Sequence, residues 1–250
     1  MPVSPKDIAW GSYKNYEGPF FRGTIKYTLP DQLTEAHRRL RVLTATEGGA
    51  YDAINMYDRC VVSVGLIQWC EGRYFLVSKL LHAVAEQVGP EVVINAMKPA
   101  LDLCCAEFRK NARGQWRFHW TDARGEVDSL EKQQQFFLGC NGLKGSWSAT
   151  AKMRARLWAS CMANVWQDPR ARGVQAKYTA DRMTAFLMRE SRAILWDKSV
   201  DDSGWSGMIR AAYLSYAGNL PAVANKHLQI AVGRLKSPKW SPNWCIGVLK

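Results

Sequence analysis

The chain has 250 residues, a 47% share of hydrophobic residues and a formal net charge of +12. This length and hydrophobic content suffice for a buried core, and no apolar run is long enough to cross a bilayer, so we expect a globular protein. A charge of this size indicates an anionic partner, which charge alone does not identify as a cell-envelope surface or a nucleic acid.

The basic residues are dispersed along the chain and form no long run or known nucleic-acid motif. Dispersed cations are typical of a solvated basic surface, and we therefore expect no nucleic-acid partner. The groups nearest to a cluster are Arg38, Arg39 and Arg41, then Lys152, Arg154 and Arg156, and finally Arg170 and Arg172.

Residues 1–30 are predicted to form an irregular N-terminal arm that packs on the core through its aromatic side chains. The first residues, Met1 to Asp7, lack the basic and then apolar pattern of a cleavable signal peptide. We assign the remaining residues, 31–250, to one domain.

A helix is predicted from Asp31 to Glu47, because apolar residues recur at the three-and-four spacing of a buried face and Glu47 takes the next position on that face. Asp31 is a good N-cap, and Gly48-Gly49 provides a C-terminal stop. Partial burial and the negative end of the helix dipole would both raise the pKa of Glu47, as a general acid requires. The alternative is a surface glutamate at a frayed helix end. The apolar positions are Leu33, Ala36, Leu40 and Leu43.

Two short runs rich in aromatic and β-branched residues follow, at 51–58 and 60–64, and they predict a small hairpin. Asp52 and Asp58 lie in the first run, and Ser63 lies in the second. A second helix is expected to open at Gly65 and to include Gln68 near its start.

Gly89-Pro90 marks a break before a helix predicted at about 90–110. Residues 116–127 alternate between apolar and polar and contain a turn sequence at 122–125, which predicts a hairpin. We interpret residues 95–148 as an insertion into the domain.

The helical period returns at Ala149, with an apolar series that ends before Asp168-Pro169. Further helices are predicted at about 174–197 and 205–217. The fold class is therefore mainly α, of the α+β type. The apolar series consists of Met153, Leu157, Cys161 and Val165.

Seven cysteines without a CxxC pair or another metal-binding spacing indicate mostly buried free thiols rather than a disulfide framework. The four histidines are scattered singly, and His119 is expected to be a packed or hydrogen-bonded strand residue. We therefore predict no metal and no cofactor.

The order of helix, glutamate, hairpin, Ser-x-Gly-Leu-Ile-Gln turn and helix resembles the lysozyme superfamily, and most closely the family 23 lytic transglycosylases and the goose-type and phage muramidases. Glu47 matches the catalytic acid of those enzymes, and Ser63 to Gln68 matches the turn. Residues 211–221, AAYLSYAGNLP, are similar to the Ala-Tyr-Asn-Ala-Gly-Pro element of family 23 or the Ser-Phe-x-x-Asn stretch of phage lysozymes. Tyr216 or Tyr213 would there hold the acid, while Asn219 is displaced from its usual place.

The resemblance implies a lysozyme-like helical domain with a small hairpin beside the catalytic helix, and a glycosidase that cleaves the β-1,4 bond between N-acetylmuramic acid and N-acetylglucosamine. Glu47 would be the general acid, and Asp58 the favoured group to stabilise the oxocarbenium-like centre. Asp52 is the other candidate for that role, or has a structural role. If neither faces the sugar, the substrate's own N-acetyl group assists and the product is an anhydro-sugar.

Ser63 and Gln68 are expected to bind the sugar or Glu47, with Tyr216 in support. The expected partners are peptidoglycan glycan strands and the anionic cell envelope, and we expect a monomer. Without a cleavable signal peptide, the protein would be made in the cytoplasm and reach the periplasmic wall by release, injection or delivery on a virion. The alternatives are a non-catalytic wall-binding component of a virion or secretion apparatus, and a chitinase- or chitosanase-type hydrolase.

Overall fold

The computed structural model describes residues 2–27, 49–73 and 75–190 of the chain. Two compact units divide the chain: the first comprises Met1–Lys26 and Ala50–Ala176, and the second comprises Tyr27–Gly49 and Lys177–Lys250. Residues 1–26 therefore belong to the same unit as 50–176, which differs from the predicted boundary at residue 30. The predicted insertion, 95–148, lies within the first unit.

The first unit contains a five-stranded antiparallel sheet in which neighbours in sequence are neighbours in space. A short 3-10 helix, η1 (Pro5–Asp7), precedes it. The strands are β1 (Ala9–Tyr13), β2 (Tyr16–Phe21), β3 (Ile54–Asn55), β4 (Ser63–Val64) and β5 (Trp69–Cys70).

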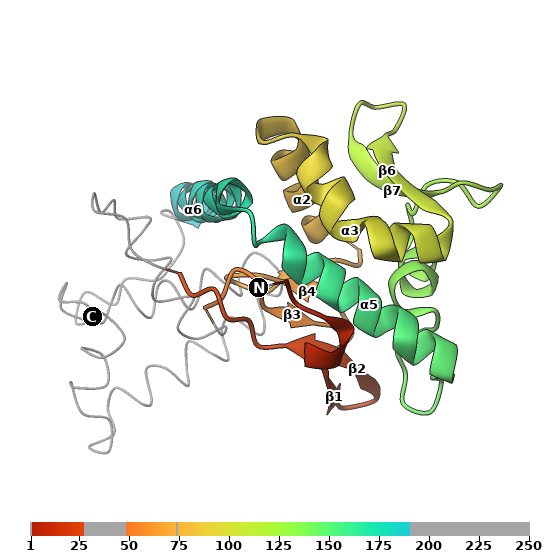
Figure 1. The fold of residues 1–250 in the computed structure, drawn as a ribbon. Coiled ribbons are helices and arrows are strands. Elements are labelled where there is room, and N and C mark those ends of the chain that lie inside the picture. Colours follow the sequence, from red (N-terminus) through yellow and green to blue (C-terminus); the bar gives the residue numbers. More distant parts are fainter. Residues whose placement is uncertain (1, 28–48, 74, 191–250) are drawn as a thin grey trace, which may run out of the picture. The chain divides into compact units, whose positions relative to one another are not determined.

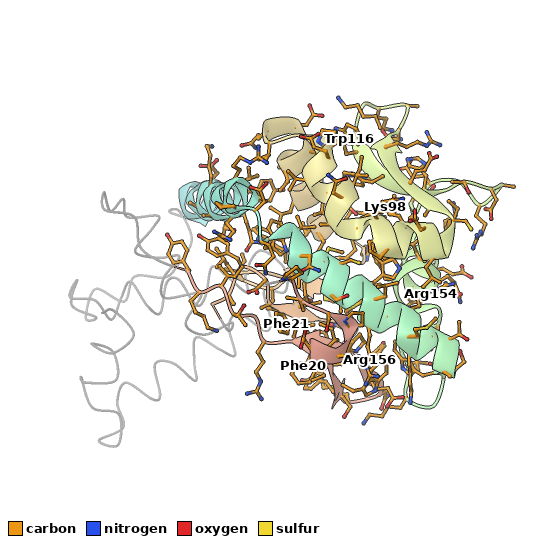
Figure 2. All side chains as sticks on the ribbon, in the orientation of Figure 1. Phe20, Phe21, Lys98, Trp116, Arg154 and Arg156 are labelled. Atoms are coloured by element: carbon orange, nitrogen blue, oxygen red, sulfur yellow. A yellow bond between two sulfur atoms is a disulfide. The ribbon has the colours of Figure 1, made fainter. Side chains whose placement is uncertain are left out.

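The prediction of an irregular N-terminal arm is wrong, because β1 and β2 form the first hairpin of this sheet. Their register pairs Ala9 with Phe20 and Tyr13 with Tyr16. Phe20 and Phe21 then pair with Asn55 and Ile54 of β3, so β2 joins the N-terminal hairpin to the predicted hairpin. Both phenylalanines are labelled in Figure 2.

The predicted hairpin of residues 51–64 is confirmed in β3 and β4, with Asn55 opposite Ser63. The helix expected to open at Gly65 is not formed there. Residues 65–68 make a turn, β5 follows, and the helix α2 (Leu76–Gln87) begins only after it. The turn is closed by a hydrogen bond from the Gln68 N–H to the Gly65 carbonyl oxygen, at 3.1 Å.

The helix α3 (Pro90–Cys104) begins as predicted but ends six residues earlier than expected. Cys105 adopts a left-handed conformation, with φ of 49°, which a helix does not continue through. The following residues instead form β6 (Ala106–Lys110), which pairs with β7 (Trp116–Trp120). The hairpin predicted at 116–127 is confirmed only in part: β7 is paired mainly with β6, and a single bridge joins His119 to Glu126. His119 is buried on β7, as predicted for a strand residue.

Three more helical segments complete the first unit. They are α4 (Leu130–Gln133), continuing into a π-helical turn η2 (Gln134–Leu138), then α5 (Ala149–Val165), and the start of α6 (Pro169–Glu190). The α5 boundaries agree with the prediction, and Ser148 caps its first turn by accepting from the Ala151 N–H at 3.1 Å. The predicted apolar series does not describe its buried face throughout, because Met153 is exposed. The helix predicted at 205–217 lies outside the described residues.

The core forms where α5 lies between α3 and the five-stranded sheet (Figure 1). Near the middle of α5, an aromatic cluster joins this helix, the β6–β7 hairpin and the π-helical turn through ring centroids 4.8 to 5.6 Å apart. Its members are Phe118, Phe136, Phe137 and Trp158. The described part of the chain is thus an α+β structure with small antiparallel sheets, and within it no helix is long and apolar enough to cross a membrane.

Candidate functional site

Glu47 and Tyr216, the predicted acid and its supporting tyrosine, lie outside the described residues. The four remaining predicted site residues, Asp52, Asp58, Ser63 and Gln68, all lie in the segment of the five-stranded sheet that runs from residue 50 to β5.

Asp58 lies in the loop between β3 and β4, where its carboxylate is held at both oxygens. The Cys60 N–H donates to Oδ1 at 2.7 Å, and the Asn55 side-chain amide donates to Oδ2 at 3.2 Å. Burial raises the pKa of Asp58 to about 6, against the opposing effects of the Cys60 hydrogen bond and the positive charge of Arg59. A carboxyl group with this pKa exchanges its proton near neutral pH, as acid–base or electrostatic catalysis requires.

A disulfide between Cys60 and Cys70 fixes this loop to β5. The prediction of mostly free thiols is therefore wrong for this pair. It holds for Cys104, Cys140 and Cys161, which are buried free thiols, while Cys105 is free but exposed. Cys60 lies in the β3–β4 loop two residues after Asp58, and Cys70 ends β5, so their bond restricts the position of Asp58.

Asp52 has a structural role in the described chain. Its side chain is fully buried, and its carboxylate accepts hydrogen bonds from the Thr24 N–H at 2.9 Å, the Thr24 hydroxyl at 3.0 Å and the Ile25 N–H at 2.9 Å. These bonds attach the chain after β2 to the chain before β3. A carboxylate enclosed in this way has no face to offer a sugar, so the predicted substrate contact of Asp52 gives way to the structural alternative.

Ser63 and Gln68 are held by the sheet and its turn. Ser63 is buried in β4, between Asn55 of β3 and Cys70 of β5. The Gln68 side-chain amide donates to the Gly65 carbonyl oxygen at 3.1 Å, and Gln68 has a left-handed backbone with φ of 54°. The Ser-x-Gly-Leu-Ile-Gln sequence therefore forms a strand end and a tight turn.

Gln175, which the sequence pattern did not indicate, locks this turn in place. Its side chain is fully buried on α6, where Oε1 accepts from the Leu66 N–H at 2.9 Å and Nε2 donates to the Tyr51 carbonyl oxygen at 3.2 Å. Gly65 has φ of +79°, and a Cβ there would lie 2.7 Å from Cδ of Gln175. Position 65 therefore requires glycine for two reasons: its left-handed backbone conformation and the close approach of the Gln175 side chain.

Glu71 is a buried acid with a raised pKa that the sequence did not predict. It accepts from the Ser78 N–H at 2.8 Å and from the Ser78 hydroxyl, and the Gln133 side-chain amide lies 3.4 Å away. Burial raises the pKa of Glu71 to about 7, although the Ser78 hydrogen bonds and the Arg117 charge act in the opposite direction. The sequence does contain a signal for this contact, since Glu71 comes seven residues before Ser78 in the first turn of α2. The signal could not be used, because the helix was predicted to begin at Gly65.

The described residues contain no group of three or more histidine, cysteine or acidic side chains that could hold a metal ion. What they offer chemically is a disulfide-fixed loop whose carboxyl group, Asp58, has a pKa raised to about 6. Comparison with protein families, with curated proteins and with solved structures found no match to this chain.

Proposed function

We propose that the chain is a peptidoglycan-degrading glycosidase, a muramidase or lytic transglycosylase in which Glu47 is the general acid. The substrate bond is the β-1,4 linkage between N-acetylmuramic acid and N-acetylglucosamine. The observation that supports this best is the hairpin that follows Glu47 in the sequence, because it carries Asp58 in a fixed loop and with a pKa of about 6.

Asp58 is the proposed second group. With a pKa of about 6 it is mostly ionised at pH 7, so it can stabilise positive charge at the anomeric carbon or act as a nucleophile. The Asn55 amide and the Cys60 N–H orient its two oxygens. In a transglycosylase the N-acetyl group of the substrate takes over this role, and Asp58 would then matter much less.

The turn and its neighbours would shape the sugar-binding surface. Gln68 is partly exposed at the turn of residues 65–68, where the Leu66 N–H donates to the Gln175 side chain. We propose that Gln68 contacts the glycan, while Ser63, which is buried, supports the sheet under it. The net charge of +12 would favour binding to the anionic envelope.

The test is digestion of purified peptidoglycan followed by mass spectrometry of the released sugars. Reducing-end muramic acid would identify a hydrolase, and anhydro-muramic acid a transglycosylase. Release of neither sugar by the wild-type protein would overturn the proposal and favour the non-catalytic wall-binding alternative.

Glu47→Gln should lower the rate of release on the order of a hundredfold to ten-thousandfold, because the amide cannot donate the proton. The matched control is Glu131→Gln, an exposed acid on α4, which should leave the rate unchanged. Retention of more than a tenth of the activity by Glu47→Gln, at an unchanged melting temperature, would show that another group is the acid. Asp58→Asn should cause a large loss only if the released sugar identifies a hydrolase.

A further inference from the structure

The hairpin of β6 and β7 has two different faces. Phe108 and Phe118 pair across the strands and belong to the aromatic core. The residues that alternate with them are ionisable, and they pair as Glu107 with His119 and Arg109 with Arg117. Side chains of one strand alternate between the faces, so the second face of this hairpin is built from ionisable groups. Trp116, labelled in Figure 2, ties the hairpin to α2 by donating to Glu86 at 2.7 Å.

A cavity of about 420 Å³ opens at the turn end of this charged face. Its volume lies in the range of small-molecule sites. Two guanidinium groups, two carboxylates, two amides and one aromatic ring contribute to its wall. They belong to Arg113, Arg117, Glu126, Asp128, Asn111, Gln115 and Phe75.

Arg117 is the buried cation of this cavity, with 8% of its surface exposed. Its Nη1 donates to the carbonyl oxygens of Ser78 at 3.4 Å and Trp116 at 3.1 Å, and its Nη2 donates to the Gln115 side chain at 3.1 Å. A guanidinium group has five N–H bonds. The Nε–H and one Nη2–H therefore have no partner among the described residues, and an edge of this kind suits a carboxylate.

The two carboxylates on the cavity wall interact with residues other than Arg113 and Arg117. Glu126 accepts from the Asn111 side-chain amide at 3.0 Å, and Asp128 pairs with Lys132 at 2.8 Å. Within the residues that the structure describes, no ion pair joins Arg113 or Arg117 to either acid. Charges of both signs thus line one cavity without neutralising each other by direct contact.

A ligand that binds both the arginines and the carboxylates of this cavity must carry a negative and a positive charge. We propose that the cavity binds the zwitterion of a small amino acid or of a short peptide with free ends. Its carboxylate lies at Arg117 and Arg113, and its ammonium group at Glu126 and Asp128. Phe75 provides an apolar wall for a small aliphatic side chain. This site is separate from the proposed glycosidase chemistry and does not depend on it.

The probes are alanine and the dipeptide alanyl-alanine, each titrated into the full-length protein by isothermal calorimetry up to 10 millimolar, a concentration on the order of a weak site's Kd. The N-acetylated and C-amidated dipeptides are the comparison ligands. Tighter binding of the dipeptide than of alanine would assign a peptide, and the reverse a free amino acid. Both blocked forms should bind at least about tenfold more weakly, since each lacks one charge. Equal binding of blocked and free forms, or no binding of any probe, would overturn the proposal.

Variants distinguish the cavity from the charged face as a whole. Glu126→Gln and Arg113→Gln should each weaken dipeptide binding by about tenfold, a loss of about 1.4 kcal/mol. The matched controls are Glu107→Gln and Arg109→Gln, which lie on the same face, pair with each other at 3.4 Å and do not line the cavity. Equal losses in all four variants would show a general charge effect and refute the site.

Discussion

Replacement of Glu71 by glutamine should remove much of the pH dependence of stability. Burial raises the pKa of Glu71 in the folded protein from its ordinary value of 4.5 to about 7. The folded state therefore holds this proton more tightly than the unfolded state does. The stability that this provides is complete below about pH 4.5 and is lost as pH rises through 7.

The magnitude follows from the difference between the two pKa values. Each pKa unit corresponds to about 1.4 kcal/mol, so the free energy of unfolding should fall by up to about 3 kcal/mol between pH 4.5 and pH 8 through Glu71 alone. The glutamine side chain has the same shape, with Oε1 to accept from the Ser78 N–H and Nε2 to donate to the Ser78 hydroxyl, and it does not titrate. The Glu71→Gln protein should lack this fall.

The assay is urea denaturation of both proteins at half-unit intervals from pH 4.5 to pH 8, followed by tryptophan fluorescence. Asp58 also has a raised pKa, about 6, and destabilises both proteins to the same extent as pH rises, so the difference between the two curves isolates Glu71. Glu131→Gln, an exposed acid, serves as control and should parallel the wild type. Parallel curves for Glu71→Gln and wild type would refute the link between burial and proton affinity at this position.

Two further substitutions test the framework around the candidate site. Gly65→Ala should lower the free energy of unfolding by about 2 kcal/mol or more, because a φ of +79° strains alanine and its Cβ meets Gln175. Gly114→Ala, at φ of +71° with open space around the site, supplies the matched control, and an equal loss in both would assign the whole effect to backbone strain. Joint replacement of Cys60 and Cys70 by alanine should cost about 3 kcal/mol in thermal or urea unfolding, as expected for a loop of this length. A double variant as stable as the oxidised wild type would show that the loop is held by other contacts.

The sequence predicted the helices best where local signals agreed. The return of the helical period at Ala149 and the stop at Asp168-Pro169 predicted α5 closely. The two N-terminal strands were not predicted, because Gly11, Gly18 and Pro19 interrupt the alternation of apolar and polar residues that indicates a strand. In the sheet, Gly11 pairs with Gly18, and Pro19 pairs with Trp10. Strand formation at these residues depends on pairing with β3, more than thirty residues further along the chain, which no local sequence pattern indicates.

The candidate site was predicted in part for the same reason. The hairpin around Asp58 follows from local β-propensity, and the structure confirms it. The Cys60–Cys70 disulfide depends on the pairing of β4 with β5, which a helix prediction starting at Gly65 had excluded. Gln175 contacts the turn across more than a hundred residues, so only tertiary packing identifies its role.

The two-faced hairpin of β6 and β7 limits how this part of the chain can change in length. Adding or deleting one residue within β7 would turn Phe118 toward the face of ionisable groups and bring Arg117 into the aromatic core, and the same change within β6 would reverse Phe108. Changes of two residues would keep the faces but break the cross-strand partners. A change of length in the loop at 111–115 would leave the side chains of both strands on their present faces. Natural variation in length at this hairpin should therefore be confined to its tip, which is also the wall of the cavity.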